Sequence, residues 1–101
     1  MKSFIPNLNY YTIMNHNIFE VVAREISRQL SGHVDITREQ SLREDLGLSS
    51  IKMVFVLTSV TGELDIDIMN FADYELLRMK TVGDLIDLLQ SKNEASHEHT
   101  N

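Results

Sequence analysis

The sequence has 101 residues, of which 43% are hydrophobic and 24% are charged, as is usual for one soluble globular domain. It contains no cysteine, which excludes disulfides, thiolate metal sites and a cysteine nucleophile. The net charge of −6 argues against a nucleic-acid partner, because phosphates would repel this protein. No apolar run approaches the ~18 residues of a membrane span, and our default expectation is a cytoplasmic monomer.

Residues 1–14 show no hydrophobic periodicity, so we interpret them as a flexible leader. Met14 directly precedes the first helix pattern and is a candidate natural start, with residues 1–13 as an over-extended reading frame. The folded domain is predicted to span residues 15–91. The polar residues 92–101 are predicted to form a flexible tail.

The first helix is predicted to run from Ile18 to about Leu30, with Asn17 as N-cap and Glu20 completing a capping box. Apolar residues that recur every four positions form its expected buried stripe: Ile18, Val22, Ile26 and Leu30. The solvent-facing side is expected to hold Arg24, Glu25, Arg28 and Gln29. Gly32 is expected to end the helix.

The connection at residues 33–49 is long for a loop without local structure. Its apolar side chains are spaced to hold it on a core: Ile36, Leu42, Leu46 and Leu48. The second helix, predicted from Ser50 to about Leu64, is the most apolar segment, with Val56, Leu57, Val60 and Leu64 as its core stripe. Three further apolar residues, Ile51, Val54 and Phe55, indicate either burial on several sides or an apolar docking surface.

The second half of the chain is predicted to form a connector and two more helices. Residues 65–68 alternate polar and apolar but lack a strand to pair with, so we expect an extended connector that buries both isoleucines. A short helix is predicted from Phe71 to Leu77, with Asn70 as its cap. The last helix is predicted to begin at Thr81, where Thr81 and Asp84 match a capping box. The fold class is therefore all-α: a small four-helix bundle of three main helices and one short helix, with a long first loop.

Acidic residues are concentrated between positions 44 and 75, where seven acids stand against one base, Lys52. They are Glu44, Asp45, Glu63, Asp65, Asp67, Asp73 and Glu75. Such a field favours docking to basic patches on partner proteins. A merely solvated surface explains the same charges equally well.

Two adjacent hydroxyls, Ser49 and Ser50, stand at the start of the predicted second helix. Free backbone N–H groups and the helix dipole favour a phosphate at such a position. The alternative is that Ser50 is an ordinary N-cap, which stabilises a helix by about 1 kcal/mol, and local physics alone favours the cap.

Three motifs resemble the family of acyl and peptidyl carrier proteins. Residues 45–51, Asp-Leu-Gly-Leu-Ser-Ser-Ile, resemble the family's Asp-Leu-Gly-x-Asp-Ser-Leu. Residues 64–68, Leu-Asp-Ile-Asp-Ile, resemble its Phe-x-Ile-x-Ile, and residues 81–85, Thr-Val-Gly-Asp-Leu, resemble the opening of its last helix. The resemblance covers residues 17–90 and implies a carrier rather than an enzyme. In that family the serine receives 4′-phosphopantetheine from coenzyme A through a phosphopantetheinyl transferase.

By this resemblance Ser50 is the attachment position, and Ser49, which replaces the family's usual aspartate, is a second candidate hydroxyl. The thiol of the arm would hold an acyl or aminoacyl group as a thioester, for presentation to loading, modifying and condensing enzymes. The resemblance implies these partner-facing residues: Glu44, Asp45, Ile51, Val54, Phe55, Glu63 and Asp65.

Departures from the family pattern favour a specialised pathway. Phe55, Thr61 and Gly62 stand where carriers of fatty-acid synthesis tend to have glutamates. We therefore expect a stand-alone carrier of polyketide, nonribosomal-peptide or modified-lipid assembly. An aminoacyl or peptidyl carrier, and an unmodified carrier-like interaction module, are the alternatives. The sequence His97-Glu98-His99 lacks the further ligands that a metal site needs.

Overall fold

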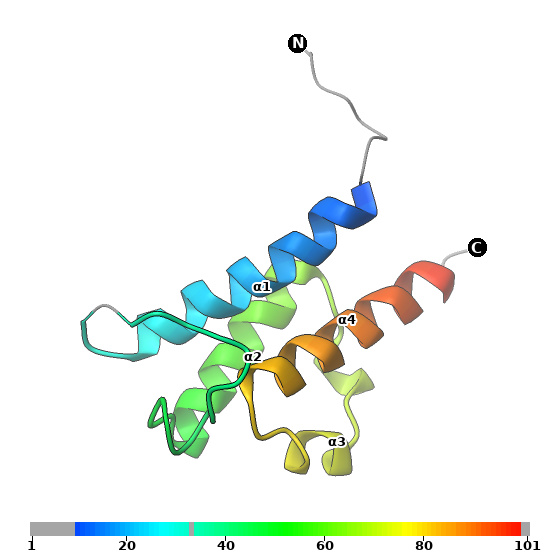
Figure 1. The fold of residues 1–101 in the computed structure, drawn as a ribbon. Helices are drawn as coiled ribbons and strands as arrows, with labels where there is room; N and C mark the ends of the chain where they lie inside the picture. The colour runs from blue at the N-terminus through cyan, green and yellow to red at the C-terminus, as the bar shows by residue number, and fades with distance from the viewer. Residues whose placement is uncertain (1–9, 33, 100–101) are drawn as a thin grey trace.

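The structure is a computed structural model that describes the backbone of residues 10–32 and 34–99 and the side chains of residues 18–32 and 34–94. In chain order it contains α1 (Tyr10–Gln29), α2 (Ser50–Leu64), a 3₁₀ turn η1 (Ile68–Asn70), α3 (Asp73–Leu77) and α4 (Val82–His99). Helix α1 contacts both α2 and α4, and the short α3 lies beside the start of α4 (Figure 1). The described residues form no β-strand. The predicted all-α bundle of three long helices and one short helix is confirmed.

Helix α1 is longer than predicted. It begins at Tyr10, so Asn17 lies inside the helix and is not its N-cap, and residues 10–14 of the predicted leader are helical. The sequence between Tyr10 and Ile18 contains neither glycine nor proline, and therefore nothing in it interrupts a helix. Residues 1–9 lie outside the described part of the chain, and the start at Met14 stays a prediction.

The buried stripe of α1 is confirmed, but one polar residue belongs to it. Ile18, Val22 and Ile26 are fully buried, as predicted. Glu25, expected on the solvent side, is only 4% exposed. Its carboxylate lies 3.4 Å from the guanidinium nitrogens of both Arg24 and Arg28. The buried face is wider than a four-residue spacing suggests, and the two arginines compensate the charge that it includes.

The loop between α1 and α2 is held on the core as predicted. Leu42, Leu46 and Leu48 are buried, and Ile36 packs against them at the margin of the core. The loop backbone is also bonded to the start of α4: Leu42 N–H donates to the Lys80 carbonyl at 2.9 Å. In return, Val82 N–H donates to the carbonyl of Gln40 at 3.0 Å. The loop is therefore a fixed part of the fold.

The segment between α2 and α3 differs from its prediction. Ile66 is buried as expected, but Ile68 is 41% exposed because it begins the 3₁₀ turn. The Asp67 carboxylate caps that turn by accepting a hydrogen bond from Met69 N–H at 2.9 Å. Helix α3 begins at Asp73 rather than Phe71, because residues 68–70 already form the turn and Phe71 is extended and buried. Asn70 is therefore not the cap of α3.

The start of α4 is confirmed and its end is not. Asp84 N–H donates to Thr81 Oγ at 3.1 Å, and Thr81 N–H donates to an Asp84 carboxylate oxygen at 3.0 Å, which completes the predicted capping box. The helix then continues to His99, through most of the predicted tail. Residues 92–99 contain no glycine or proline, and Lys92 and Asn93 extend the packed face, Lys92 by pairing with Glu75 at 2.9 Å.

Candidate functional site

The two serines at the start of α2 have different roles. Ser49 is the N-cap: its backbone is extended and its hydroxyl accepts a hydrogen bond from Lys52 N–H at 3.3 Å. Ser50 is the first helical residue, and its side chain is exposed. The expectation that Ser50 caps the helix is therefore wrong: Ser49 caps α2, and the Ser50 hydroxyl makes no capping bond.

Among the described side chains, Arg43 is the partner of the Ser50 hydroxyl, and sequence reasoning missed it. Arg43 donates to Ser50 Oγ through Nη2 at 2.6 Å. The two residues are seven positions apart and separated by a turn, so no helical or strand periodicity connects them. The sequence gives one indication of this contact: a cationic residue stands a few positions before the start of a helix, and helix starts favour anions.

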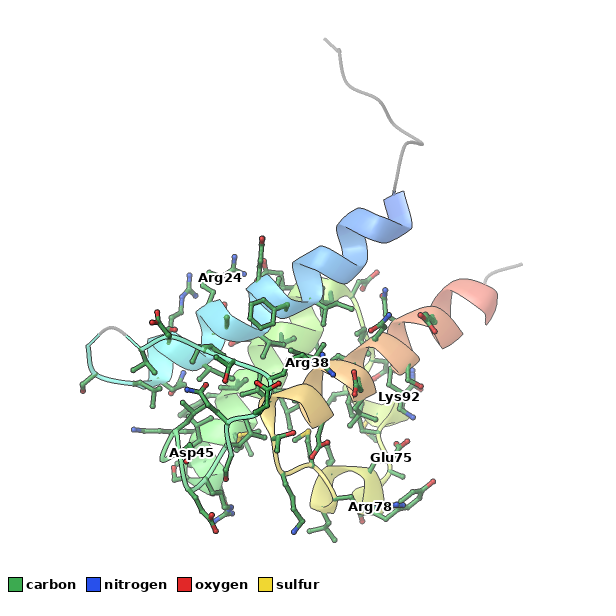
Figure 2. The ribbon with its side chains drawn as sticks, viewed as in Figure 1. Arg24, Arg38, Asp45, Glu75, Arg78 and Lys92 are labelled. Atoms are coloured by element: carbon green, nitrogen blue, oxygen red, sulfur yellow. The ribbon has the colours of Figure 1, made fainter. Side chains whose placement is uncertain are left out.

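A compact turn positions Arg43 and leads into α2. Ser41 N–H donates to an Asp45 carboxylate oxygen at 2.7 Å, and Glu44 N–H donates to Ser41 Oγ at 3.0 Å. Gly47 has a φ of +67°, which favours glycine, and its N–H donates to the Arg43 carbonyl at 3.0 Å. Figure 2 shows Asp45 on this loop. The Asp45 carboxylate thus fixes the turn itself, in addition to any contact with a partner.

The exposed face of α2 is apolar. Ile51, Val54 and Phe55 are 59%, 52% and 51% exposed, while Val56 and Val60 on the opposite face are fully buried. Of the two interpretations of this apolar helix, burial on several sides is therefore wrong for these three residues. They form an exposed surface, here called the α2 apolar face, that begins next to Ser50.

The predicted acidic contacts do not gather at one place. Glu44 and Asp45 precede α2, whereas Glu63 and Asp65 lie at its other end, about 22 Å away at 1.5 Å per residue. Glu63 forms an ion pair with Arg24 of α1, which Figure 2 labels. Asp65 is exposed and ends α2 in the left-handed conformation, with φ at 59°. The structure therefore places negative charge at both ends of α2 and none in its middle.

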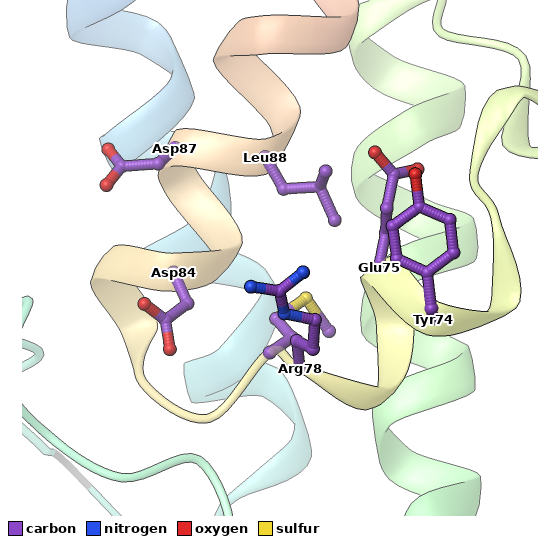
Figure 3. A pocket seen from close by; sticks show the side chains of 7 residues that line it. Tyr74, Glu75, Arg78, Asp84, Asp87 and Leu88 are labelled. Atoms are coloured by element: carbon purple, nitrogen blue, oxygen red, sulfur yellow. The ribbon is translucent and has the colours of Figure 1, made fainter.

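A pocket of about 370 Å³ lies between α3 and the start of α4 (Figure 3). No predicted site residue lines it; its lining is Tyr74, Glu75, Arg78, Met79, Asp84, Asp87 and Leu88. Three of its charged groups have partners within the protein. Glu75 pairs with Lys92, Asp87 pairs with Arg38, and Asp84 caps α4. Most charged groups of the pocket therefore already have a structural role.

Neither a metal-binding cluster nor a membrane-spanning helix occurs among the described residues. They contain no cluster of three histidine, cysteine or acidic side chains that could hold a metal ion, and the side chains of His97 and His99 lie outside them. None of the described helices is both long enough and apolar enough to cross a membrane.

The helix order is consistent with a small helical bundle like that of acyl carrier proteins. This chain is 28% identical over 76 residues to a curated protein named Acyl carrier protein from Exiguobacterium sp. (strain ATCC BAA-1283 / AT1b). The alignment covers 75% of this chain and 89% of that protein. No protein-family model and no solved structure matches the chain. The resemblance predicted from the three motifs is confirmed by this relative.

Proposed function

We propose that this chain is an acyl carrier protein. It tethers acyl intermediates as thioesters on a 4′-phosphopantetheine arm at Ser50 and presents them to biosynthetic enzymes without catalysing a reaction itself. The observation that carries the proposal is the exposed Ser50 hydroxyl in the first turn of α2, within the motif at residues 45–51 and freed from capping by Ser49. The name of the curated relative supports the same role.

The residues around Ser50 fit a phosphodiester-linked arm. The Ser50 side chain is exposed, so a transferase can reach its hydroxyl. The first turn of α2 and the Arg43 guanidinium both favour an anion at this oxygen. When bound, the arm supplies a terminal thiol that carries the cargo as a thioester. The protein's own contribution is to anchor the arm at Ser50 and to dock on each partner.

The partners proposed are a phosphopantetheinyl transferase and the enzymes that load, modify and condense the cargo. The α2 apolar face supports their docking beside the arm, because Ile51 follows Ser50 directly and is exposed. Glu44 and Asp65, both exposed, add negative charge at the two ends of that face. Asp45 adds to it at the first end, whereas Glu63 is partly engaged with Arg24.

The proposed pathway is a specialised one, such as polyketide, nonribosomal-peptide or modified-lipid assembly. Helix α2 contains one acidic residue, Glu63, so its exposed face offers enzymes apolar contacts instead of a row of carboxylates. An aminoacyl cargo is the alternative within the carrier class. An unmodified interaction module is the alternative outside it.

The experiment is loading with coenzyme A, magnesium and a promiscuous transferase, followed by intact mass measurement and peptide mapping. We expect one arm on the wild-type protein and on Ser49→Ala, and none on Ser50→Ala. Ser49→Ala should also lower the free energy of unfolding by about 1 kcal/mol through the lost cap, and Ser50→Ala should lower it less.

The outcomes separate the candidate functions. A folded Ser50→Ala protein that still accepts one arm would move the attachment to Ser49. A folded wild-type protein that accepts no arm, either in vitro or when isolated from its native host, would favour the unmodified interaction module. Circular dichroism of each variant establishes that it is folded.

A further inference from the structure

We propose that Arg43 binds the phosphodiester of the arm. This contact would hold the Ser50-linked end of the arm against the turn before α2. This inference rests on the proposed attachment at Ser50. It assigns a positioning role to a side chain outside the motif at residues 45–51. The observation behind it is the 2.6 Å hydrogen bond from Arg43 Nη2 to the oxygen that would carry the phosphoryl group.

Arg43 has N–H donors that are not engaged by a carboxylate, unlike three other arginines of the protein. Arg24 and Arg28 are paired with Glu25, and Arg38 is paired with Asp87. Arg43 forms no ion pair with any side chain that the structure describes, and its contact is with a neutral hydroxyl. A guanidinium has five N–H donors in a planar fork that matches phosphate oxygens. One donor is used here, so the others are available to an anion attached at the same point.

Among the described side chains, no carboxylate forms an ion pair with this guanidinium. The residue before Ser50 is the uncharged Ser49, which is engaged with Lys52 N–H. The nearby Asp45 carboxylate accepts from Ser41 N–H within the turn. A phosphodiester on Ser50 would therefore be the first anion to satisfy Arg43, and its charge would make these hydrogen bonds stronger than the present one to a hydroxyl.

The backbone that carries Arg43 is fixed before any ligand arrives. Leu42 is buried and bonded to Lys80, and the Arg43 carbonyl accepts from Gly47 N–H at 3.0 Å. A cation on a fixed turn loses less conformational freedom on binding an anion than one on a mobile loop. Arg43 therefore orients the arm toward the start of the α2 apolar face and does not act only as a diffuse positive charge.

The test compares unmodified and arm-bearing protein for the wild type, Arg43→Gln, Arg43→Lys and Arg78→Gln. Mass mapping first confirms the arm on Ser50 in each sample. Arg78 is the matched control, because it is exposed, forms no ion pair with a described side chain and lies at the end of α3, away from the turn that holds Arg43. We expect the shift in Tm on arm attachment to be about 2–6 °C more favourable in the wild type than in Arg43→Gln.

Further readouts separate the guanidinium from a general charge effect. Arg78→Gln should keep the wild-type shift, Arg43→Lys should keep part of it, and high salt should reduce it. In ¹⁵N-arginine NMR of the wild type, the Arg43 guanidinium signal should move on arm attachment, and this measurement needs no variant to be loaded. An equal Tm shift in wild type and Arg43→Gln, or an unmoved Arg43 signal, overturns the inference. An arm absent from Ser50 in the folded wild type overturns the proposed function instead.

Discussion

Single carboxylates and hydroxyls cap the starts of α2 and α4. Asp84 accepts hydrogen bonds from the backbone N–H groups of Lys80, at 2.9 Å, and Thr81, at 3.0 Å. Ser49 has the corresponding role at α2. The Thr81–Asp84 cap was predictable because its partners are three residues apart. The cap of α2 was not, because Ser49 and Ser50 are equivalent in sequence and only backbone angles distinguish them.

The Asp84 cap makes stability depend on pH. Hydrogen bonds from Lys80 N–H and Thr81 N–H lower the pKa of Asp84 below its ordinary value. The folded protein therefore binds this proton less tightly than the unfolded chain does. The contribution is complete above about pH 4, the unfolded value, and is lost as the pH falls further. We expect Asp84→Asn to lower the urea midpoint at pH 7 and to flatten its decline in acid.

The control for this measurement is Glu20→Gln, which removes an exposed carboxylate that has no partner among the described residues. It should keep the wild-type pH profile of the urea midpoint. An Asp84→Asn profile as steep as that of the wild type would show that the cap does not contribute to acid sensitivity.

At the scale of elements, the first loop and the start of α4 depend on a close approach of two backbones. Gly83 N–H donates to the Arg38 carbonyl at 2.8 Å, and Arg38 also pairs with Asp87 at 2.9 Å. A Cβ added to Gly83 would lie 3.2 Å from that carbonyl oxygen. Glycine at this position therefore avoids a tight contact between α4 and the backbone of the first loop.

A pair of glycine substitutions tests this contact. Gly83→Ala should lower the free energy of unfolding by an amount on the order of 1 kcal/mol, because crowding against Arg38 outweighs the gain in helix propensity. Gly62→Ala, in α2 with no atom near its added Cβ, should raise it by up to about 1 kcal/mol. Urea unfolding measures both. A gain in both variants would mean that the loop moves away from α4 without cost.

At the scale of the whole molecule, one core joins the loop to α1, α2 and α4. Leu48 in the loop is 1% exposed, whereas Ile51, three residues later, is 59% exposed. Both are large aliphatic residues on either side of the same helix start. Which of them is buried is decided by the packing of the other helices, because only the inward side of the α2 start meets them.

This difference predicts unequal costs of truncation. Leu48→Ala should lower the free energy of unfolding by about 2–5 kcal/mol, since it leaves a cavity in the core. Ile51→Ala should change it by no more than about 0.5 kcal/mol, because its side chain is already largely in water. Chemical denaturation compares them. Equal losses would mean that the α2 apolar face is covered in solution.

The sequence by itself determined the features that depend on neighbouring residues. The Thr81–Asp84 capping box and the buried stripe of α1 each follow from spacings of three or four residues. The motif at residues 45–51 likewise indicated Ser50 as the proposed attachment position without the structure. Helix ends at Tyr10 and His99 were missed, because polar composition predicts solvent exposure and does not by itself end a helix.

Only the tertiary structure decided which side chains are buried or exposed and which groups from different segments meet. It buried Glu25 between two arginines, exposed Ile51, Val54 and Phe55, and engaged Glu63 with Arg24. It also brought Arg43 onto the Ser50 hydroxyl. These contacts and exposures depend on how the loop and helices pack in three dimensions. Periodicity along the chain does not predict that packing.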